Sequence, residues 1–173
     1  GTLERPGRSL AGVIYKGKQE RRVLSAEFNL EHRPSELIVE VFLPRPNSRC
    51  GASLMRIGRT QADVALLNAA ALVEIADGVY KRVRLVLGGV NMEPIRLHAV
   101  EKQLEGRAVV HPVNSQALLS LLQSGMASFR PPADIRASSG YRRVSGMGLA
   151  YRTLEEAINV AYWRSMVSSE EGS

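Results

Sequence analysis

The chain has 173 residues and a net charge of +6, of which +5 falls within residues 1–60. Its lysines and arginines are not interleaved with the aromatic side chains on which bases stack, so we expect no nucleic-acid partner despite the positive charge. One cysteine and three widely separated histidines exclude an intramolecular disulfide and disfavour a metal site, and no apolar run reaches the roughly 18 residues that span a membrane.

The first third of the chain predicts short strands. Extended segments are expected at residues 9–15 and 21–28, with a turn-rich stretch between them, and at 37–43, where β-branched and aromatic residues dominate. Pro44 and Pro46 end the third strand, because proline cannot donate a hydrogen bond to a sheet. We therefore place the main domain boundary within residues 44–51, which begin with these prolines.

The middle of the chain predicts a further strand at 52–58 and then a β-hairpin. Residues 64–75 are so apolar that they fit a buried helix as well as a buried strand. The Asp77-Gly78 pair supplies the positive φ angles of a tight turn, and residues 79–89 alternate between polar and apolar. We therefore assign both arms to strands.

The remainder of the chain predicts helices. The first covers 97–105 and stops at Gly106, and the second runs from an Asn114 cap to about residue 129, where two prolines follow. The last and longest helix covers 140–166. Its expected buried positions are Tyr141, Val144, Leu149, Leu154, Ile158 and Ala161.

The predicted fold class is α+β, with a small antiparallel sheet layered against two or three helices. We divide the chain into residues 1–50, a domain at 51–166 and a disordered tail at 167–173. The single thiol, Cys50, fits a reducing compartment, and we expect a cytoplasmic protein.

Residue chemistry alone assembles no self-sufficient active site. Gly88-Gly89 after a strand is only a weak signal for phosphate binding, and no P-loop or dinucleotide-binding motif is present. The segment 131–143 is rich in arginine, which fits either a solvated loop or a binding site. Gly146 and Gly148, within the long helix, indicate close packing against a neighbouring element rather than ligand contact.

Four stretches, taken in order, resemble one protein family. They are "SELIVEVFLP" at 35–44, "SLMRIGRTQADVALLNAAALVEI" at 53–75, "VRLVLGGVNMEPIRLHAVEKQLEGR" at 83–107 and "PPADIRASSGYRRVSGMGLAYRTLEEAI" at 131–158. Their order and spacing are similar to the C-terminal half of the FAD-binding medium subunit of molybdenum hydroxylases, the family of the carbon monoxide dehydrogenase flavoprotein and the xanthine dehydrogenase FAD subunit. The resemblance extends over about residues 20–160.

The resemblance implies a domain identity, a cofactor and partners. Residues 51–166 would be the flavoprotein C-terminal domain, and residues 1–50 the tail of the second FAD-binding subdomain. The complete subunit would bind FAD and pass electrons to an acceptor such as NAD. It would receive them from a molybdopterin-binding large subunit and an iron–sulfur small subunit, and those cofactors would belong to the partners alone. A homo-oligomer is also compatible with the family.

The resemblance also places two residues at the flavin. Arg56 occupies the basic position that opens a K/R-x-x-R motif beside the isoalloxazine, and Ile38 lies in a strand whose backbone approaches the ring. A fixed cation there stabilises the negative charge of reduced flavin. Arg59 and Asp63 are four residues apart and form either a local ion pair or part of the cofactor site.

The family's glycine-rich loops, which hold the FAD pyrophosphate, are not in this sequence. We therefore expect the chain alone to bind FAD weakly and not to be catalytic by itself. An alternative of a different class is a non-catalytic interaction domain that has lost flavin binding and binds a protein partner. A third, nucleic-acid binding, rests only on the net charge.

Overall fold

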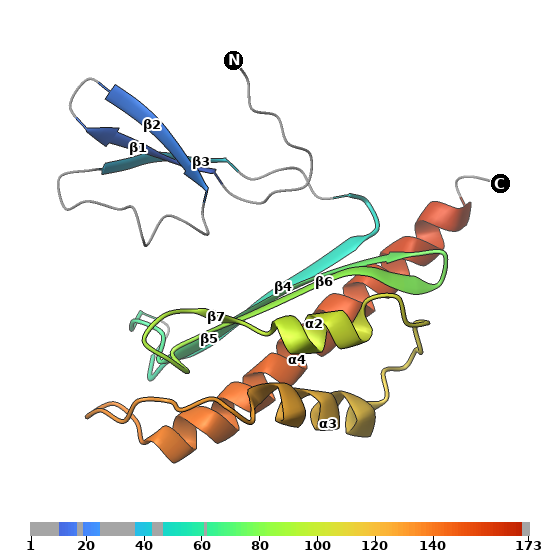
Figure 1. Ribbon diagram of the computed structural model, residues 1–173. Coiled ribbons are helices and arrows are strands. Elements are labelled where there is room, and N and C mark those ends of the chain that lie inside the picture. The colour runs from blue at the N-terminus through green and yellow to red at the C-terminus, as the bar shows by residue number, and fades with distance from the viewer. Residues whose placement is uncertain (1–10, 17–18, 25–36, 43–46, 61, 171–173) are drawn as a thin grey trace. The chain divides into compact units, whose positions relative to one another are not determined.

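The computed structural model describes residues 11–16, 19–24, 37–42, 47–60 and 62–170. The chain divides into two compact units, residues 1–46 and 47–173, and each is described by itself. The described part of the first unit is an antiparallel sheet with strand order β2-β1-β3 (Figure 1). Its strands are β1 (Ala11–Lys16), β2 (Gln19–Leu24) and β3 (Leu37–Phe42). The three strands predicted here are confirmed, although residues 9–10, 25–28 and 43 lie outside the described part.

In its described residues, the second unit is a four-stranded antiparallel sheet covered by three helices, so the predicted α+β class is confirmed (Figure 1). The strand order is β4-β5-β6-β7. The strands are β4 (Cys50–Ile57), β5 (Leu67–Ala76), β6 (Val79–Gly88) and β7 (Ile95–Arg96). The helices are α2 (His98–Leu104), α3 (Ser115–Met126) and α4 (Ser139–Glu170).

The β5–β6 hairpin forms where the turn chemistry predicts it. Asp77 and Gly78 adopt φ angles of 54° and 69°. Every second residue of β5 from Leu67 to Ile75 is buried, whereas the intervening residues are exposed or half-buried. This period of two settles the ambiguity of the apolar tract in favour of a strand with one covered face.

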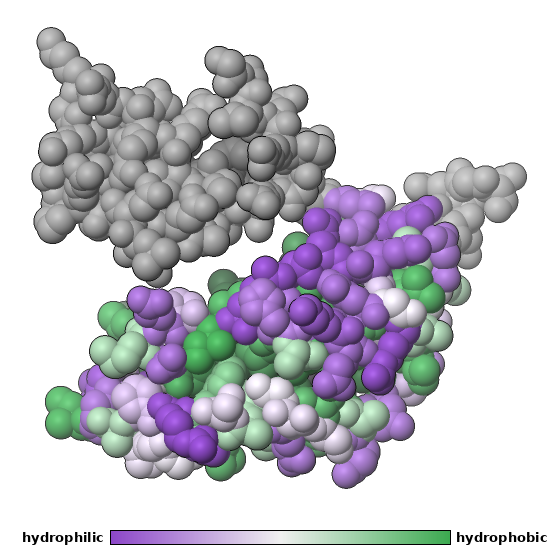
Figure 2. Space-filling view, viewed as in Figure 1, coloured by the Kyte–Doolittle hydropathy of each residue, from purple (hydrophilic) through white to green (hydrophobic). Residues whose placement is uncertain are grey.

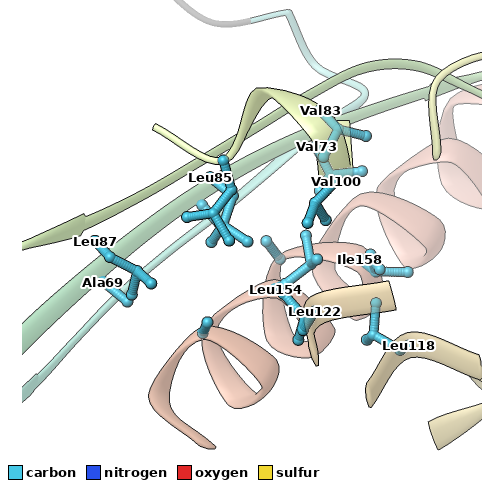
Figure 3. Packing of buried hydrophobic residues seen from close by; sticks show 14 of the residues in the cluster. Ala69, Val73, Val83, Leu85, Leu87, Val100, Leu118, Leu122, Leu154 and Ile158 are labelled. Carbon is cyan, nitrogen blue, oxygen red and sulfur yellow. The ribbon is translucent and has the colours of Figure 1, made fainter. Parts of the chain in front are cut away.

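The hydrophobic core lies between the covered sheet face and the helices (Figure 3). Leu85 and Leu87 of β6 point into the same space as Leu122 of α3 and Leu154 of α4. All four are fully buried or nearly so. Burial of a side chain of this size stabilises the fold by about 1.5–3 kcal/mol, so this layer supplies the main cohesion of the unit.

Helix α4 lies against β4 and β5, and small residues let the two layers approach closely. A Cβ atom on Gly51 of β4 would lie 2.1 Å from the carbonyl oxygen of Ala157 and 2.4 Å from the backbone nitrogen of Ala161. Gly146 meets Val90 in the same way, at 2.8 Å, which confirms the packing role predicted for it. A Cβ on Gly148 would meet nothing within 4 Å among the described residues, so the same prediction is wrong for that glycine.

Helix α2 covers the edge of β6 that β7 leaves open. The Glu101 side chain accepts a hydrogen bond from the Leu85 N–H at 2.9 Å, and Glu105, one turn later, accepts one from the Val83 N–H at 3.0 Å. Partial burial opposes the charged form of Glu105, but the Val83 N–H and the Arg84 guanidinium outweigh it and lower the pKa of this carboxyl. Two carboxylates therefore satisfy strand-edge amides that would otherwise be free to pair with another chain.

The structure corrects four details of the prediction. Tyr141 and Val144 are 48% and 67% exposed, because only the later turns of α4 lie under the sheet. Residues 167–170, assigned to a disordered tail, continue the helix, and 171–173 lie outside the described part. Residues 64–66 precede β5 instead of belonging to it, and the short β7 was not predicted. No helix in the described ranges, α4 included, is apolar enough over a sufficient length to cross a membrane.

Candidate functional site

Three connections meet at one end of the second unit. They are the β4–β5 connection (58–66, with residue 61 outside the described part), the β6–β7 connection (89–94) and the segment 130–138 that leads into α4 (Figure 1). Loops held at the end of a rigid layer are a common place for binding residues. The Arg56 position predicted for the flavin lies here, at the end of β4.

Arg142, in the first turns of α4, joins all three connections. Its guanidinium donates from Nη1 to the Gly89 carbonyl at 2.9 Å and to the Leu66 carbonyl at 3.2 Å. Its Nη2 donates to the Asp134 carboxylate at 2.8 Å. The residue is only 4% exposed, and its Nε is the one atom of the group without a partner among the described residues. A buried guanidinium of this kind fixes the loops in one geometry.

Asp134 closes a tight turn against α4. Its Oδ1 accepts hydrogen bonds from the backbone N–H groups of Arg136 and Ala137 at 2.9 and 3.0 Å, while Oδ2 accepts from Arg142. The Ala137 amide and then the Arg142 guanidinium hold the pKa of Asp134 below its ordinary value. The carboxylate stays charged and the turn stays closed at neutral pH.

The β4–β5 connection is tied down at both ends. The Arg56 guanidinium donates to the Thr60 carbonyl at 3.0 Å, and the Asp63 N–H donates to the Thr60 hydroxyl at 3.2 Å. From the third connection, Arg136 donates to the Val64 carbonyl at 3.0 Å. Arg59 and Asp63 form an exposed ion pair at 3.5 Å, which confirms the local-pair alternative for these two residues.

Arg56 is exposed and lies on the sheet face opposite α4. Met55 and Ile57, its neighbours in β4, pack against the core, so the alternation of the strand turns Arg56 to the other side. Its hydrogen bond to Thr60 keeps the charge near the loops. The position therefore fits a cation beside the edge of a bound ring.

Ile38 and Arg56, the two residues predicted at the flavin, lie in different units. Ile38 is in β3 of the first unit, opposite Ile14 of β1, and is 43% exposed. Arg56 is in β4 of the second unit. The two units are described separately, so the joint placement of Ile38 and Arg56 at one site stays a prediction.

The Gly88-Gly89 pair has a packing role. A Cβ on Gly89, which has a φ of 82°, would lie 2.1 Å from the Leu66 carbonyl oxygen, and one on Gly88 would lie 2.5 Å from the Asn68 side chain. These glycines let two strands and a loop approach one another, so they provide no cradle for a phosphate. Arg56 has the charge that suits the ring of a reduced flavin, whereas the surroundings of Gly88 and Gly89 do not suit its pyrophosphate.

A groove on the second unit offers less chemistry than the loop end that carries Arg56. A shallow groove of about 420 Å³ between α2 and α3 is mostly apolar, with Tyr80 and Arg107 at its wall. Burial raises the pKa of Tyr80, so the phenol stays protonated at neutral pH. In the described ranges, His, Cys, Asp and Glu side chains do not gather into groups of three that could hold a metal ion.

The structural roles of Arg142 and Asp134 are not predicted by the sequence. The segment 131–143 was interpreted as either a solvated loop or a binding site, and neither interpretation places an arginine in the interior. The signal that was present is the stretch 131–158, one of the four on which the family resemblance rests.

Comparison with known proteins matches the second unit to one family. The model of the CO dehydrogenase flavoprotein C-terminal domain matches residues 52–157. Caffeine dehydrogenase subunit beta of Pseudomonas sp. strain CBB1 is 32% identical over 106 residues, which are 57% of this chain and 36% of that protein. The glyceraldehyde dehydrogenase medium chain of Sulfolobus acidocaldarius is 25% identical over 116 residues, 67% of this chain and 40% of that one.

Solved structures share the fold. Quinoline 2-oxidoreductase from Pseudomonas putida 86 has a TM-score of 0.76 at 19% identity, covering 89% of this chain and 54% of that chain. Carbon monoxide dehydrogenase from Hydrogenophaga pseudoflava has a TM-score of 0.73 at 22% identity, covering 91% and 54%. The chain thus spans well under two thirds of the length of the relatives it matches.

Proposed function

The chain belongs to the CO dehydrogenase flavoprotein C-terminal domain family, and from this we propose that it is part of an FAD-binding oxidoreductase subunit of the molybdenum hydroxylase type. The subunit works in the cytoplasm beside a molybdopterin-binding large subunit and an iron–sulfur small subunit. It passes electrons through FAD to an acceptor such as NAD. The names of two relatives, a dehydrogenase subunit beta and a dehydrogenase medium chain, support an assembly of several subunits.

The observation that carries this proposal is the position of Arg56 within the matched region. The guanidinium is exposed at the loop end of the sheet, on the face that the helices leave open, and the Thr60 carbonyl holds it. FAD supplies the hydride and electron transfer when bound. Arg56 and the loop around it form one wall of the ring site and hold a positive charge where the reduced ring is negative.

The test compares flavin binding by two proteins. The complete flavoprotein subunit should bind close to one FAD per chain, with visible flavin absorbance. The 173-residue chain should bind FAD weakly and be colourless when purified, because the phosphates of a dinucleotide supply most of its fixed anchoring and no loop for them is present in the sequence. Stoichiometric flavin in the purified 173-residue chain would contradict that second expectation.

The same experiment separates the proposal from its alternative. A complete subunit that is purified and refolded with excess FAD, and still binds none, would overturn the flavoprotein function. That result would favour the non-catalytic interaction domain.

A further inference from the structure

The groove between α2 and α3 has the size of a small-molecule site. Its lining residues fall within 103–110 and 113–124, apart from Tyr80 of β6 and Ile158 of α4, and its volume is about 420 Å³. Tyr80, Leu118 and Ile158 are buried, so the groove reaches down to the core. In Figure 2, hydrophobic residues remain visible between the strongly polar residues over α2 and the pale, weakly polar ones over α3. Sites of this volume with mostly apolar walls and a few polar groups are typical of bound small molecules.

The α2–α3 groove and Arg56 lie at opposite ends of the sheet. Arg56 pairs with Asn68 at the start of β5, whereas Tyr80 pairs with Ile75 near the end of that strand. The two pairing positions on β5 are about seven residues apart, which is roughly 20 Å of extended strand. A ligand in the groove would therefore not occupy the candidate flavin ring site.

The Tyr80 hydroxyl is a buried donor that the fold leaves without a partner. Tyr80 is 6% exposed, and its hydroxyl forms no hydrogen bond with any described residue. In the described part of the chain, the fully enclosed side-chain atoms that lack a partner are the Nε atoms of Arg82 and Arg142. The Tyr80 hydroxyl is therefore not fully enclosed, and it reaches the open space of the groove that Tyr80 lines. Buried polar groups are normally hydrogen-bonded, so this donor is available to an acceptor atom of a ligand.

Arg107 gives the groove a positive charge that no described carboxylate neutralises. Its side chain is exposed and forms no ion pair or hydrogen bond with a described residue. The lining contains neither Asp nor Glu among the described residues, and the nearby Glu105 carboxylate already binds the Val83 N–H and Arg84. Asn114, the N-cap of α3, also lines the groove, so the positive end of the α3 dipole lies at its wall. The groove therefore favours a ligand with negative charge.

Tyr80 and Arg107 are close enough to act on one group. The Tyr80 N–H donates to the Arg107 carbonyl at 3.0 Å, so the two side chains leave neighbouring backbone positions, and both line the groove. A single cation suits a monoanion, and a carboxylate can accept from a guanidinium and from a hydroxyl at the same time.

We propose that the α2–α3 groove binds a small carboxylic acid with an apolar body, such as an aryl-substituted acetate. Its carboxylate pairs with Arg107 and accepts from the Tyr80 hydroxyl, and its apolar body packs on Leu118 and the other aliphatic side chains of the lining. This inference does not rest on the proposed function, because it uses the residues of the groove alone.

The experiment measures binding of phenylacetate to the isotope-labelled 173-residue chain, by amide chemical-shift titration near neutral pH. We expect a Kd of about 1 mM, the range for a ligand with so few atoms, and shifts concentrated in α2, α3 and the start of β6. Phenylacetamide, which keeps the apolar body without the charge, should bind about fivefold more weakly. Acetate, which keeps the charge without the apolar body, should bind at least about tenfold more weakly.

Two variants test the polar contacts. Arg107→Gln should weaken phenylacetate binding about fivefold and leave phenylacetamide binding unchanged, because the charge contact alone is lost. Tyr80→Phe should weaken phenylacetate binding by about tenfold without unfolding the chain, because the hydroxyl has no partner in the fold. Arg152→Gln and Tyr141→Phe make the same changes at exposed positions outside the groove, and they should bind phenylacetate as wild type does.

Three results would overturn the proposal. Equal affinities of wild type for phenylacetate and phenylacetamide would show an apolar patch that does not recognise a carboxylate, and this comparison needs no variant. Phenylacetate binding that neither Arg107→Gln nor Tyr80→Phe weakens would place the ligand elsewhere. The absence of a saturable shift at concentrations well above the expected Kd would show that the groove binds no such acid. None of these results bears on the proposed function, which flavin binding to the complete subunit tests separately.

Discussion

At the scale of single residues, burial separates the charged side chains that hold the fold from those that face outward. Glu101 is 2% exposed, and its carboxylate accepts from the Leu85 N–H and from two nitrogens of Arg96. Arg142 is similarly enclosed and donates to backbone carbonyls. Arg56 belongs to the other class, because its side chain is exposed and donates a hydrogen bond to the Thr60 carbonyl.

Replacing Arg56 by alanine in the complete subunit should lower the flavin reduction potential more than it lowers stability. Loss of the cation destabilises the reduced form, and about 30 mV corresponds to about 1.4 kcal/mol for a two-electron couple, so a fall of tens of millivolts is expected. Asp63→Ala is the matched control. The exposed ion pair of Asp63 with Arg59 contributes at most about 1 kcal/mol to stability, and the flavin reduction potential should not change in this variant.

A redox titration beside a thermal melt of each variant checks this prediction. An unchanged potential for Arg56→Ala together with a large drop in melting temperature would show that the arginine is structural.

Replacing Glu101 by glutamine should destabilise the second unit by about 2–3 kcal/mol, because the carboxylate makes charge-assisted hydrogen bonds in the interior that an amide only partly replaces. Denaturant unfolding measures the change. Lys102→Gln, at the exposed next position of α2, should be within about 0.5 kcal/mol of wild type. Equal stabilities for the two variants would contradict the role assigned to Glu101.

At the scale of elements, α4 connects the parts of the second unit. Its first turns hold the loop end through Arg142, and its later turns lie against β4 and β5. The close approach at Gly51 and the exposure of Tyr141 and Val144 follow from this arrangement. A substitution in the first turns of α4 should therefore affect the loops, whereas one in its later turns should affect packing against the sheet.

Gly51→Ala should destabilise the unit by about 1–3 kcal/mol, the usual cost of overpacking, because the new methyl would meet the α4 backbone and not a movable side chain. Gly148→Ala makes the same chemical change within α4 where space is open. It should stabilise the helix by up to about 1 kcal/mol. Thermal melts of the two proteins should shift in opposite directions, and an unchanged or raised melting temperature for Gly51→Ala would rule out the close contact.

Because of the Asp134 turn at the start of α4, the stability of the fold should depend on pH in the acid range. The pKa of Asp134 is lower in the folded state than its ordinary value, so its contribution is fully present above that value, near pH 4, and is lost as pH falls through the folded pKa. Denaturant unfolding measured from about pH 6 down to about pH 2 should show this loss. Asp134→Asn should weaken this dependence of the unfolding free energy on pH. An identical dependence in the variant would show that the turn is not its source.

At the scale of the whole molecule, the second unit has its own core. Its buried hydrophobic cluster draws on β5, β6 and all three helices, and residues 47–173 form one compact unit. The first unit has its own sheet. An element set that closes its own core can fold without its neighbour.

Residues 47–173 expressed alone should therefore fold. We expect a cooperative unfolding transition and strong amide-exchange protection in β5, β6 and the middle of α4, since these elements make the buried layer. The full chain measured under the same conditions is the control. Absence of a cooperative transition in the shortened chain would show that the two units fold as one.

Local sequence determines most elements of this protein, because turn and cap chemistry act over a few residues. Asp77-Gly78 makes the hairpin, Asn114 caps α3 through the Ala117 N–H, and Gly106 takes a φ of 84° after α2. Arg56 lies near the end of β4, as its place in the predicted strand at 52–58 indicates. These features need no information from distant parts of the chain.

The environment of the site is set only by the tertiary structure. Arg142 reaches the Leu66 carbonyl across 76 positions of sequence, and no period or local motif reports such a pairing. The same limit explains Tyr141 and Val144, whose apolar character predicted burial although the sheet ends before it covers them. Whether a side chain is enclosed depends on which distant segments pack over it, and that is decided when the layers assemble.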